Sequence, residues 1–287
     1  MALEHDPEKW NPVSEKGATK QSTCRLSPIP NVLGMTDRER FMHRSKVVSR
    51  EDWFQAHKAH LAREKELTRL RERIAAERRE LPWLKIRKDY VFETEQGPKK
   101  LTDLFAGDSQ LIVYHFMFGP GCGHHCLGCS FLADHIDGAN QHLRHHDVSL
   151  VVISRAPLAE LLPYKQRMGW KFDWVSSYAS DFNFDMQVSF TDKQIAAGDT
   201  TYNFETRPRT SKELPGTSVF YRDETGDIFL TFMSRARGGE SLIGTYDYLD
   251  MTPKGRNENG PYHSLMDWVR LHDEYQEGWA AKPNCCD

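Results

Sequence analysis

One stretch near the middle of the chain, residues 111–131, constrains the fold more than any other: LIVYHFMFGPGCGHHCLGCSF. Its first eight residues form an apolar run of strand length, rich in β-branched and aromatic side chains, which predicts a buried strand. Three glycines and a proline then break the run. Apolar residues recur at helical spacing from Phe131 onward, which predicts a helix that begins near Ser130.

Two cysteines spaced as C-x-x-C, Cys126 and Cys129, fall at the start of this predicted helix. Unpaired backbone N–H groups and the positive end of the helix dipole favour a thiolate there over a thiol. A C-x-x-C pair between a strand and a helix is typical of a redox-active dithiol. Under this hypothesis Cys126 is the nucleophile, Cys129 resolves the mixed disulfide, and the partner is a thiol or disulfide on a protein or a small molecule.

The same turn also carries the side chains of a soft-metal site. Cys122, Cys126 and Cys129 supply three thiolates, and His124 or His125 supplies an imidazole. Seven of the chain's 13 histidines lie in this stretch and the helix after it, an excess that a redox pair does not need. Thiolates with imidazole suit copper(I) or zinc(II), so binding of one of these metals is the alternative hypothesis. The redox hypothesis itself requires no cofactor.

The composition excludes several other classes of protein. With 287 residues, 39% of them hydrophobic and 28% charged, the chain is typical of a soluble globular protein. A formal net charge of −3 gives no support for nucleic-acid binding. No apolar run approaches the roughly 18 residues of a membrane span, and the N-terminus lacks a signal-peptide core. We therefore expect a cytoplasmic protein that contacts no membrane.

The rest of the chain predicts its organisation. A long charged amphipathic helix begins at Ser49 with Asp52 as its acidic capping partner. Together with the polar segment before it, this helix supports a third hypothesis, a non-catalytic protein that forms a homo-oligomer. The parts expected are a polar N-terminal arm (1–45), the long helix (46–82), an α/β domain (83–278) with an insertion around 191–213, and a mobile C-terminal tail (279–287) that carries Cys285 and Cys286.

Strands and helices alternate along the predicted domain, which favours parallel pairing. Two strands around a D-E-T-G-D turn predict an antiparallel hairpin near its end. Apolar residues at helical spacing predict a last helix. The elements expected are strands at 90–93, 111–118, 149–154, 217–222 and 228–234, a helical turn at 101–105, and helices at 158–168 and 265–272.

These features together resemble the thioredoxin fold, in which helices flank a mixed central sheet. Longer segments, among them YHFMFGP, CLGCSF, ELPGTSVFYRD and YDYLDMTPKGRNE, are similar to those of the DUF899 family over roughly residues 45–275. The resemblance implies a cytoplasmic, thioredoxin-like dithiol–disulfide oxidoreductase whose cysteine pair is Cys126 and Cys129. It also implies that Pro215 follows a cis peptide bond and faces this pair. Cys122, His124 and His125 depart from the family's usual pattern.

Overall fold

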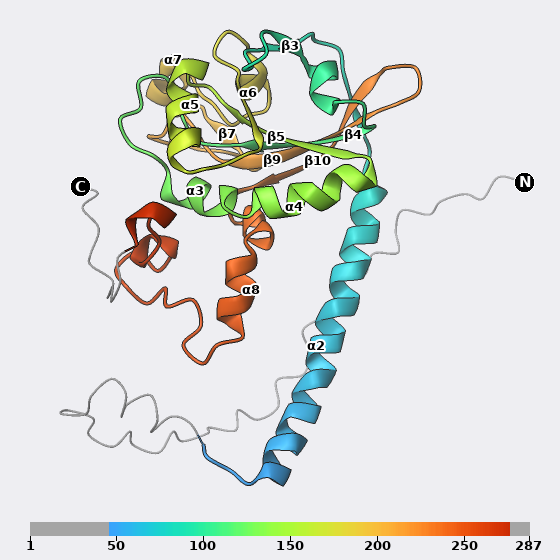
Figure 1. Cartoon of the computed structure of the whole chain (residues 1–287), viewed down its shortest axis with the longest axis vertical. Coiled ribbons are helices and arrows are strands. Elements are labelled where there is room, and N and C mark those ends of the chain that lie inside the picture. The colour runs from blue at the N-terminus through green and yellow to red at the C-terminus, as the bar shows by residue number, and fades with distance from the viewer. Residues whose placement is uncertain (1–45, 276–287) are drawn as a thin grey trace, which may run out of the picture. The chain divides into compact units, whose positions relative to one another are not determined.

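The computed structural model of the chain describes residues 46–275 (Figure 1). The predicted N-terminal arm, Cys24 and the tail with Cys285 and Cys286 lie outside these residues. The proposed division of the chain into four parts stays a prediction. None of the helices in residues 46–275 is both long enough and apolar enough to cross a membrane.

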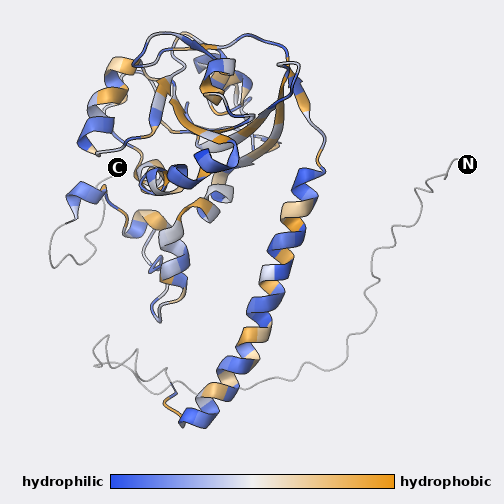
Figure 2. Ribbon diagram, turned by 45° about the vertical axis from the view of Figure 1, so that its right-hand side comes forward, coloured by the Kyte–Doolittle hydropathy of each residue, from blue (hydrophilic) through white to orange (hydrophobic). Residues whose placement is uncertain are grey.

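The predicted long helix is present as α2 (Arg50–Arg79). Its first turn is capped as expected, since Ser49 Oγ accepts a hydrogen bond from the backbone N–H of Asp52 at 3.1 Å and donates one to Asp52 Oδ2 at 2.8 Å. None of its thirty residues, all of which the structure describes, is buried. Polar and apolar residues alternate along it without a wide apolar face (Figure 2).

A six-stranded sheet forms the centre of the fold. Three neighbouring strands, β4, β5 and β6, run parallel, while β9 is antiparallel to β4 and β10 is antiparallel to β9. The predicted parallel pairing and the predicted hairpin are therefore both confirmed. In spatial order the strands are β1 (Leu84–Ile86), β10 (Ile228–Arg235), β9 (Gly216–Arg222), β4 (Gln110–His115), β5 (Val148–Ser154) and β6 (Asp173–Ser176).

The four inner strands identify the fold. The order β5-β4-β9-β10, with two parallel strands followed by two antiparallel ones, is that of the thioredoxin fold. β6 extends this core at one edge and β1 extends it at the other. The predicted fold class, a thioredoxin-like mixed sheet flanked by helices, is confirmed.

Helices connect the parallel strands. Between β4 and β5 the chain forms α3 (Leu127–Ala133) and α4 (Ile136–Leu143), and between β5 and β6 it forms α5 (Leu158–Arg167). The shorter elements are β2 (Val91–Phe92), β3 (Lys99–Lys100), α6 (Phe182–Asp185), α7 (Asp192–Ala197), β7 (Thr201–Tyr202), β8 (Glu205–Thr206), α8 (Gly244–Asp250) and 3₁₀ turns at Leu101–Phe105, Arg144–His146, Ala236–Leu242, Leu265–Asp267 and His272–Glu274.

Side chains that alternate along the strands divide the core into two layers. On one face, Tyr114 and Phe116 pack with residues of α3, α5 and α8. On the other face, Leu111 and Val113 pack with the 3₁₀ turn after β3 and with α6. Tyr202, inside the expected surface insertion, also lies buried in this second layer. The segment 191–213 is therefore partly interior.

Two expected helix boundaries differ from the structure. α3 begins at Leu127, earlier than the expected start near Ser130, because the backbone turns helical directly after Cys126. The predicted last helix was wrong, since residues 265–275 contain two separate 3₁₀ turns. Trp268 leaves the helical region at φ −143° and ψ −26°, and Val269 and Leu271 both enter the core. Apolar residues at helical spacing therefore belong here to an irregular segment and not to a helix.

The buried indole of Trp174 gives a test of the first core layer. Its ring is 1% exposed, and its Nε1–H donates a hydrogen bond to Ser154 Oγ at 3.0 Å. We expect Trp174→Ala to lower the free energy of unfolding by about 3–5 kcal/mol, because it leaves a large cavity. Urea denaturation of the full chain measures the loss. Tyr178→Ala is the control, since that ring is 51% exposed and its loss changes stability by about 0.5 kcal/mol or less. Equal losses in both variants would contradict this account of the core.

Candidate functional site

The two cysteines of the C-x-x-C pair lie at the beginning of α3, as the sequence predicts. Cys126 is the N-cap residue, with extended backbone angles of φ −67° and ψ 111°. Its Sγ accepts a hydrogen bond from the backbone N–H of Cys129 at 3.3 Å, and its carbonyl accepts one from the N–H of Ser130 at 2.9 Å. Both cysteines are free thiols. The cap thus holds the Cys126 sulfur over the first turn of the helix.

The electrostatic environment favours a thiolate at Cys126. A hydrogen bond from the Cys129 thiol is the main cause that lowers the pKa of Cys126, and the backbone N–H groups of Cys129 and Gly128 lower it further. Burial acts in the opposite direction but is outweighed. The sulfur of Met117 lies 3.9 Å from that of Cys126 and provides a polarizable, uncharged neighbour.

The environment of Cys129 favours the thiol instead. Cys129 is 1% exposed, and its burial holds its pKa well above the ordinary value. The backbone N–H of Met117 lies 3.5 Å from Cys129 Sγ, and the hydroxyl of Tyr114 is also hydrogen-bonded to it. The arrangement therefore favours ionisation of Cys126 over ionisation of Cys129, whose thiol is buried.

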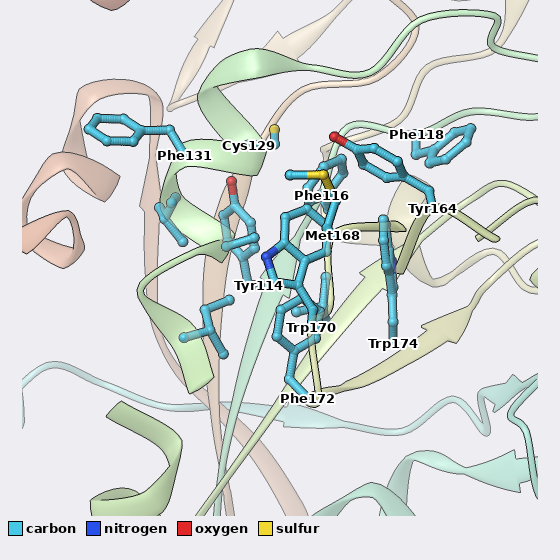
Figure 3. Packing of buried hydrophobic residues seen from close by; sticks show 14 of the residues in the cluster. Tyr114, Phe116, Phe118, Cys129, Phe131, Tyr164, Met168, Trp170, Phe172 and Trp174 are labelled. Atoms are coloured by element: carbon cyan, nitrogen blue, oxygen red, sulfur yellow. The ribbon is translucent and has the colours of Figure 1, made fainter. Parts of the chain in front are cut away.

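Aromatic side chains form a wall beside Cys129 (Figure 3). The ring of Tyr164 packs edge-on against Phe118 and is hydrogen-bonded through its hydroxyl to Ser130 Oγ at 2.8 Å. Ser130 Oγ in turn donates to the carbonyl of Cys126 at 2.9 Å. These two hydrogen bonds connect the first turn of α3 to α5 and so fix the position of the turn that carries Cys126.

A cavity of about 470 Å³ opens beside Cys126. It lies beyond the carboxyl ends of β4 and β5, the edge at which open α/β sheets commonly bind ligands. Small, polar and sulfur-containing side chains form its walls, so a substrate can reach the thiolate of Cys126 from this side. The lining residues are Met117, Gly119, Pro120, Cys122, His124, Cys126, Arg155, Ser211, Lys212 and Glu213.

The residues of the alternative metal hypothesis do not converge. Cys122 Sγ donates to the carbonyl of His124 at 3.2 Å and lies 3.8 Å from His124 Nδ1. The ring of His125 instead stacks on Tyr164, with centroids 3.5 Å apart, and burial lowers its pKa. Within residues 46–275, no group of three or more His, Cys, Asp or Glu side chains is arranged to hold a metal ion. His125 packs on the aromatic wall through Tyr164, and a metal site formed by the three cysteines with His124 or His125 stays a prediction.

The expected cis bond before Pro215 is a second correction. No cis peptide bond occurs in the described residues, so the Leu214–Pro215 bond is trans. The backbone N–H of Leu214 donates to the carbonyl of Val188 at 2.8 Å, and the chain runs extended from this contact directly into β9. An extended approach to the strand needs no cis bond. A catalytic contribution of Pro215 stays a prediction; its carbonyl accepts a hydrogen bond from the hydroxyl of Tyr202 at 2.7 Å.

The sequence analysis missed two charged residues at this site, Arg155 and Glu213. Arg155 Nε donates to Glu213 Oε1 at 2.7 Å in the cavity wall. The sequence contained one indication that Arg155 belongs to the site: it directly follows the buried strand β5 and so lies at the carboxyl end of that strand. Glu213 carried no such signal, because it belongs to the segment expected to be a surface insertion.

The sequence matches a known family model over most of its length. The model described as "Bacterial protein of unknown function (DUF899)" matches residues 42–275. No protein with a curated description matches the sequence.

Several solved structures are similar to part of the chain, among them three from bacteria. A proposed DsbE thiol:disulfide interchange protein of Chlorobium tepidum is 11% identical at a TM-score of 0.36, over 56% of this chain and 93% of that one. Peroxidoxin BcpB of Mycobacterium tuberculosis is 15% identical at a TM-score of 0.35, over 57% and 94%. A PrxQ mutant of Xylella fastidiosa is 12% identical at a TM-score of 0.38, over 55% and 88%.

The hydrogen bond from Cys129 predicts how the reactivity of Cys126 depends on pH. We expect Cys126 to be alkylated at pH 7 about tenfold faster than Cys129, with a pH midpoint below the ordinary thiol pKa. Cys129→Ala removes the donor and should move that midpoint upward. Peptide mass spectrometry after timed alkylation of the full chain measures each cysteine separately.

Cys122→Ala is the matched control for this experiment. Its thiol bonds to the carbonyl of His124 and not to Cys126, so the midpoint of Cys126 should stay unchanged. A faster reaction at Cys129, or an unmoved midpoint in Cys129→Ala, would show that the two thiols are assigned wrongly.

Proposed function

The chain belongs to the DUF899 family, and we propose that it is a thiol–disulfide oxidoreductase that uses Cys126 and Cys129 as its reacting dithiol. The observation that carries the proposal is the placement of the C-x-x-C pair: Cys126 caps α3 and its Sγ accepts the backbone N–H of Cys129, whereas the Cys129 thiol is buried behind it. This placement lowers the pKa of Cys126 and raises that of Cys129. The thiolate is the attacking species, so the cysteine with the lower pKa attacks first and the buried cysteine resolves the mixed disulfide afterwards.

The proposed reaction has two steps. The thiolate of Cys126 attacks one sulfur of a substrate disulfide, so that a mixed disulfide forms and the first substrate thiolate leaves. Cys129 then loses its proton and attacks Cys126 Sγ, which forms the Cys126–Cys129 disulfide and releases the second substrate thiolate. The substrate gains the two electrons that the dithiol loses, and the leaving thiolates take up the proton of Cys129 and one from solvent. A dithiol reductant regenerates the reduced pair.

The surroundings of the pair support this sequence of steps. The backbone N–H of Met117 and the hydroxyl of Tyr114 both contact Cys129 Sγ, so two donors are available to stabilise its thiolate when it forms. The cavity adjoins Cys126, which is half-buried, while Cys129 is closed off. A substrate disulfide therefore meets the nucleophile first.

A single-turnover experiment tests the proposed function. Fully reduced protein is mixed with hydroxyethyl disulfide, quenched with N-ethylmaleimide, and its disulfides are located by mass spectrometry. We expect a Cys126–Cys129 disulfide in the native chain, a trapped mixed disulfide on Cys126 in Cys129→Ser, and at least about a hundredfold slower reaction at this site in Cys126→Ser. Cys122→Ser is the control and should react as the native chain does. Oxidation that persists in Cys126→Ser, or that stops in Cys122→Ser, would refute the proposal.

A further inference from the structure

We infer that Arg155 makes the site selective for disulfides that carry a carboxylate at the end remote from the reacting sulfur, an inference that rests on the function proposed above. Arg155 and Cys126 line the same cavity. Arg155 reaches it from the carboxyl end of β5, whereas Cys126 reaches it from the turn after β4. One substrate in the cavity can therefore contact both side chains.

The guanidinium of Arg155 is held in a fixed position. Its Nε donates to Glu213 Oε1 at 2.7 Å, and the two side chains are only 19% and 12% exposed. Glu213 Oε2 accepts a further hydrogen bond from Ser189 Oγ, so both oxygens of the carboxylate are occupied. The guanidinium carbon also lies 4.9 Å from the ring centroid of Phe184. These contacts fix Arg155 before any substrate binds.

The backbone of the turn that leads to Cys126 packs closely against this ion pair. A Cβ atom at Gly119 would lie 3.2 Å from Glu213 Cγ and from Glu213 Oε1, a tighter approach than most Cβ atoms make. Glycine at this position therefore lets the carboxylate lie directly under the turn that leads to Cys126. The ion pair is built into the wall of the cavity.

The two terminal nitrogens of Arg155 remain available to a ligand. Within residues 46–275 neither of them makes a hydrogen bond, because only Nε binds Glu213. A planar guanidinium presents its donors as a rigid fork that matches the two oxygens of a carboxylate. The charge of Glu213 offsets part of the attraction, so geometry as well as charge must provide the selectivity. Lys212, also in the cavity wall, is paired with Asp192.

Arg155 acts on the substrate and not on the thiolate. The pKa of Cys126 is shifted by the Cys129 thiol, by burial and by the backbone N–H groups of Cys129 and Gly128. The guanidinium is not among these causes. Loss of the Arg155 charge should therefore leave the pH midpoint of Cys126 alkylation unchanged, which separates substrate recognition from activation of the nucleophile.

Three small disulfides of similar length test the inference: dithiodipropionate, which is anionic; hydroxyethyl disulfide, which is neutral; and cystamine, which is cationic. Each is mixed with fully reduced native chain, and formation of the Cys126–Cys129 disulfide is timed by quench and mass spectrometry. We expect dithiodipropionate to react about fivefold to tenfold faster than hydroxyethyl disulfide, and cystamine to react slowest.

Arg155→Gln should reduce the preference for the anion, measured as the rate with dithiodipropionate divided by the rate with hydroxyethyl disulfide, to less than about twofold. Arg155→Lys keeps the positive charge but lacks the planar, two-donor geometry of a guanidinium, so it should retain part of the preference for the anion. Lys212→Gln is the matched control and should keep most of it. Arg155→Gln combined with Glu213→Gln removes both charges of the ion pair and guards against misfolding caused by an unpaired buried carboxylate.

The outcomes separate this inference from the proposed function. If all three disulfides oxidise the native pair at equal rates, the redox function stands and the selectivity is refuted. A preference that survives Arg155→Gln but disappears in Lys212→Gln assigns the selectivity to the wrong residue and also refutes the inference. If none of the three oxidises the Cys126–Cys129 pair, the proposed function fails, and the inference fails with it.

Discussion

The hydrogen bonds that join Cys129 to the Cys126 sulfur are the interaction on which the rest of the site depends. They require α3 to begin directly after Cys126, so that the backbone N–H and the thiol of Cys129 both reach back one turn. Cys129 can take this position only because the turn after β4 brings the N–H of Met117 to its sulfur and because the aromatic layer excludes water around it. A buried thiol therefore lowers the pKa of its neighbour while its own pKa rises.

Local sequence patterns predicted those parts of the fold in which local and tertiary preferences agree. The apolar run of β4, the glycine-rich turn, the cap at Ser49 and the β9–β10 hairpin each form as their own residues dictate. The last helix failed for the opposite reason. There the apolar residues at 265–272 enter the core individually and not along one face of a helix. Burial of both Val269 and Leu271 outweighs the local preference for a helix. Periodicity alone does not distinguish these two cases.

The candidate site was predictable only as far as it is local in sequence. The order of reactivity proposed for the C-x-x-C pair rests on its place at a helix start, which the sequence indicates. The contact between Arg155 and Glu213 joins residues 58 positions apart, and the position of Glu213 depends on how the segment 191–213 returns to β9. The stacking of His125 on Tyr164 likewise depends on the placement of α5. The spacing of three cysteines beside His124 and His125 suggested a metal site, whereas packing places His125 in the aromatic wall.

The two halves of the site have different physical origins, and this difference matters for its chemistry. The dithiol depends on burial, because an apolar environment raises the pKa of the Cys129 thiol. The ion pair in the cavity wall depends on charge compensation. Glu213, which is itself hydrogen-bonded by Ser189, neutralises and orients a guanidinium that would otherwise be costly to bury. Since neither arrangement uses the residues of the other, recognition of a substrate can change without altering the thiolate. Substitutions in the cavity wall should therefore change which disulfide reacts, whereas substitutions behind Cys129 should change how fast any disulfide does.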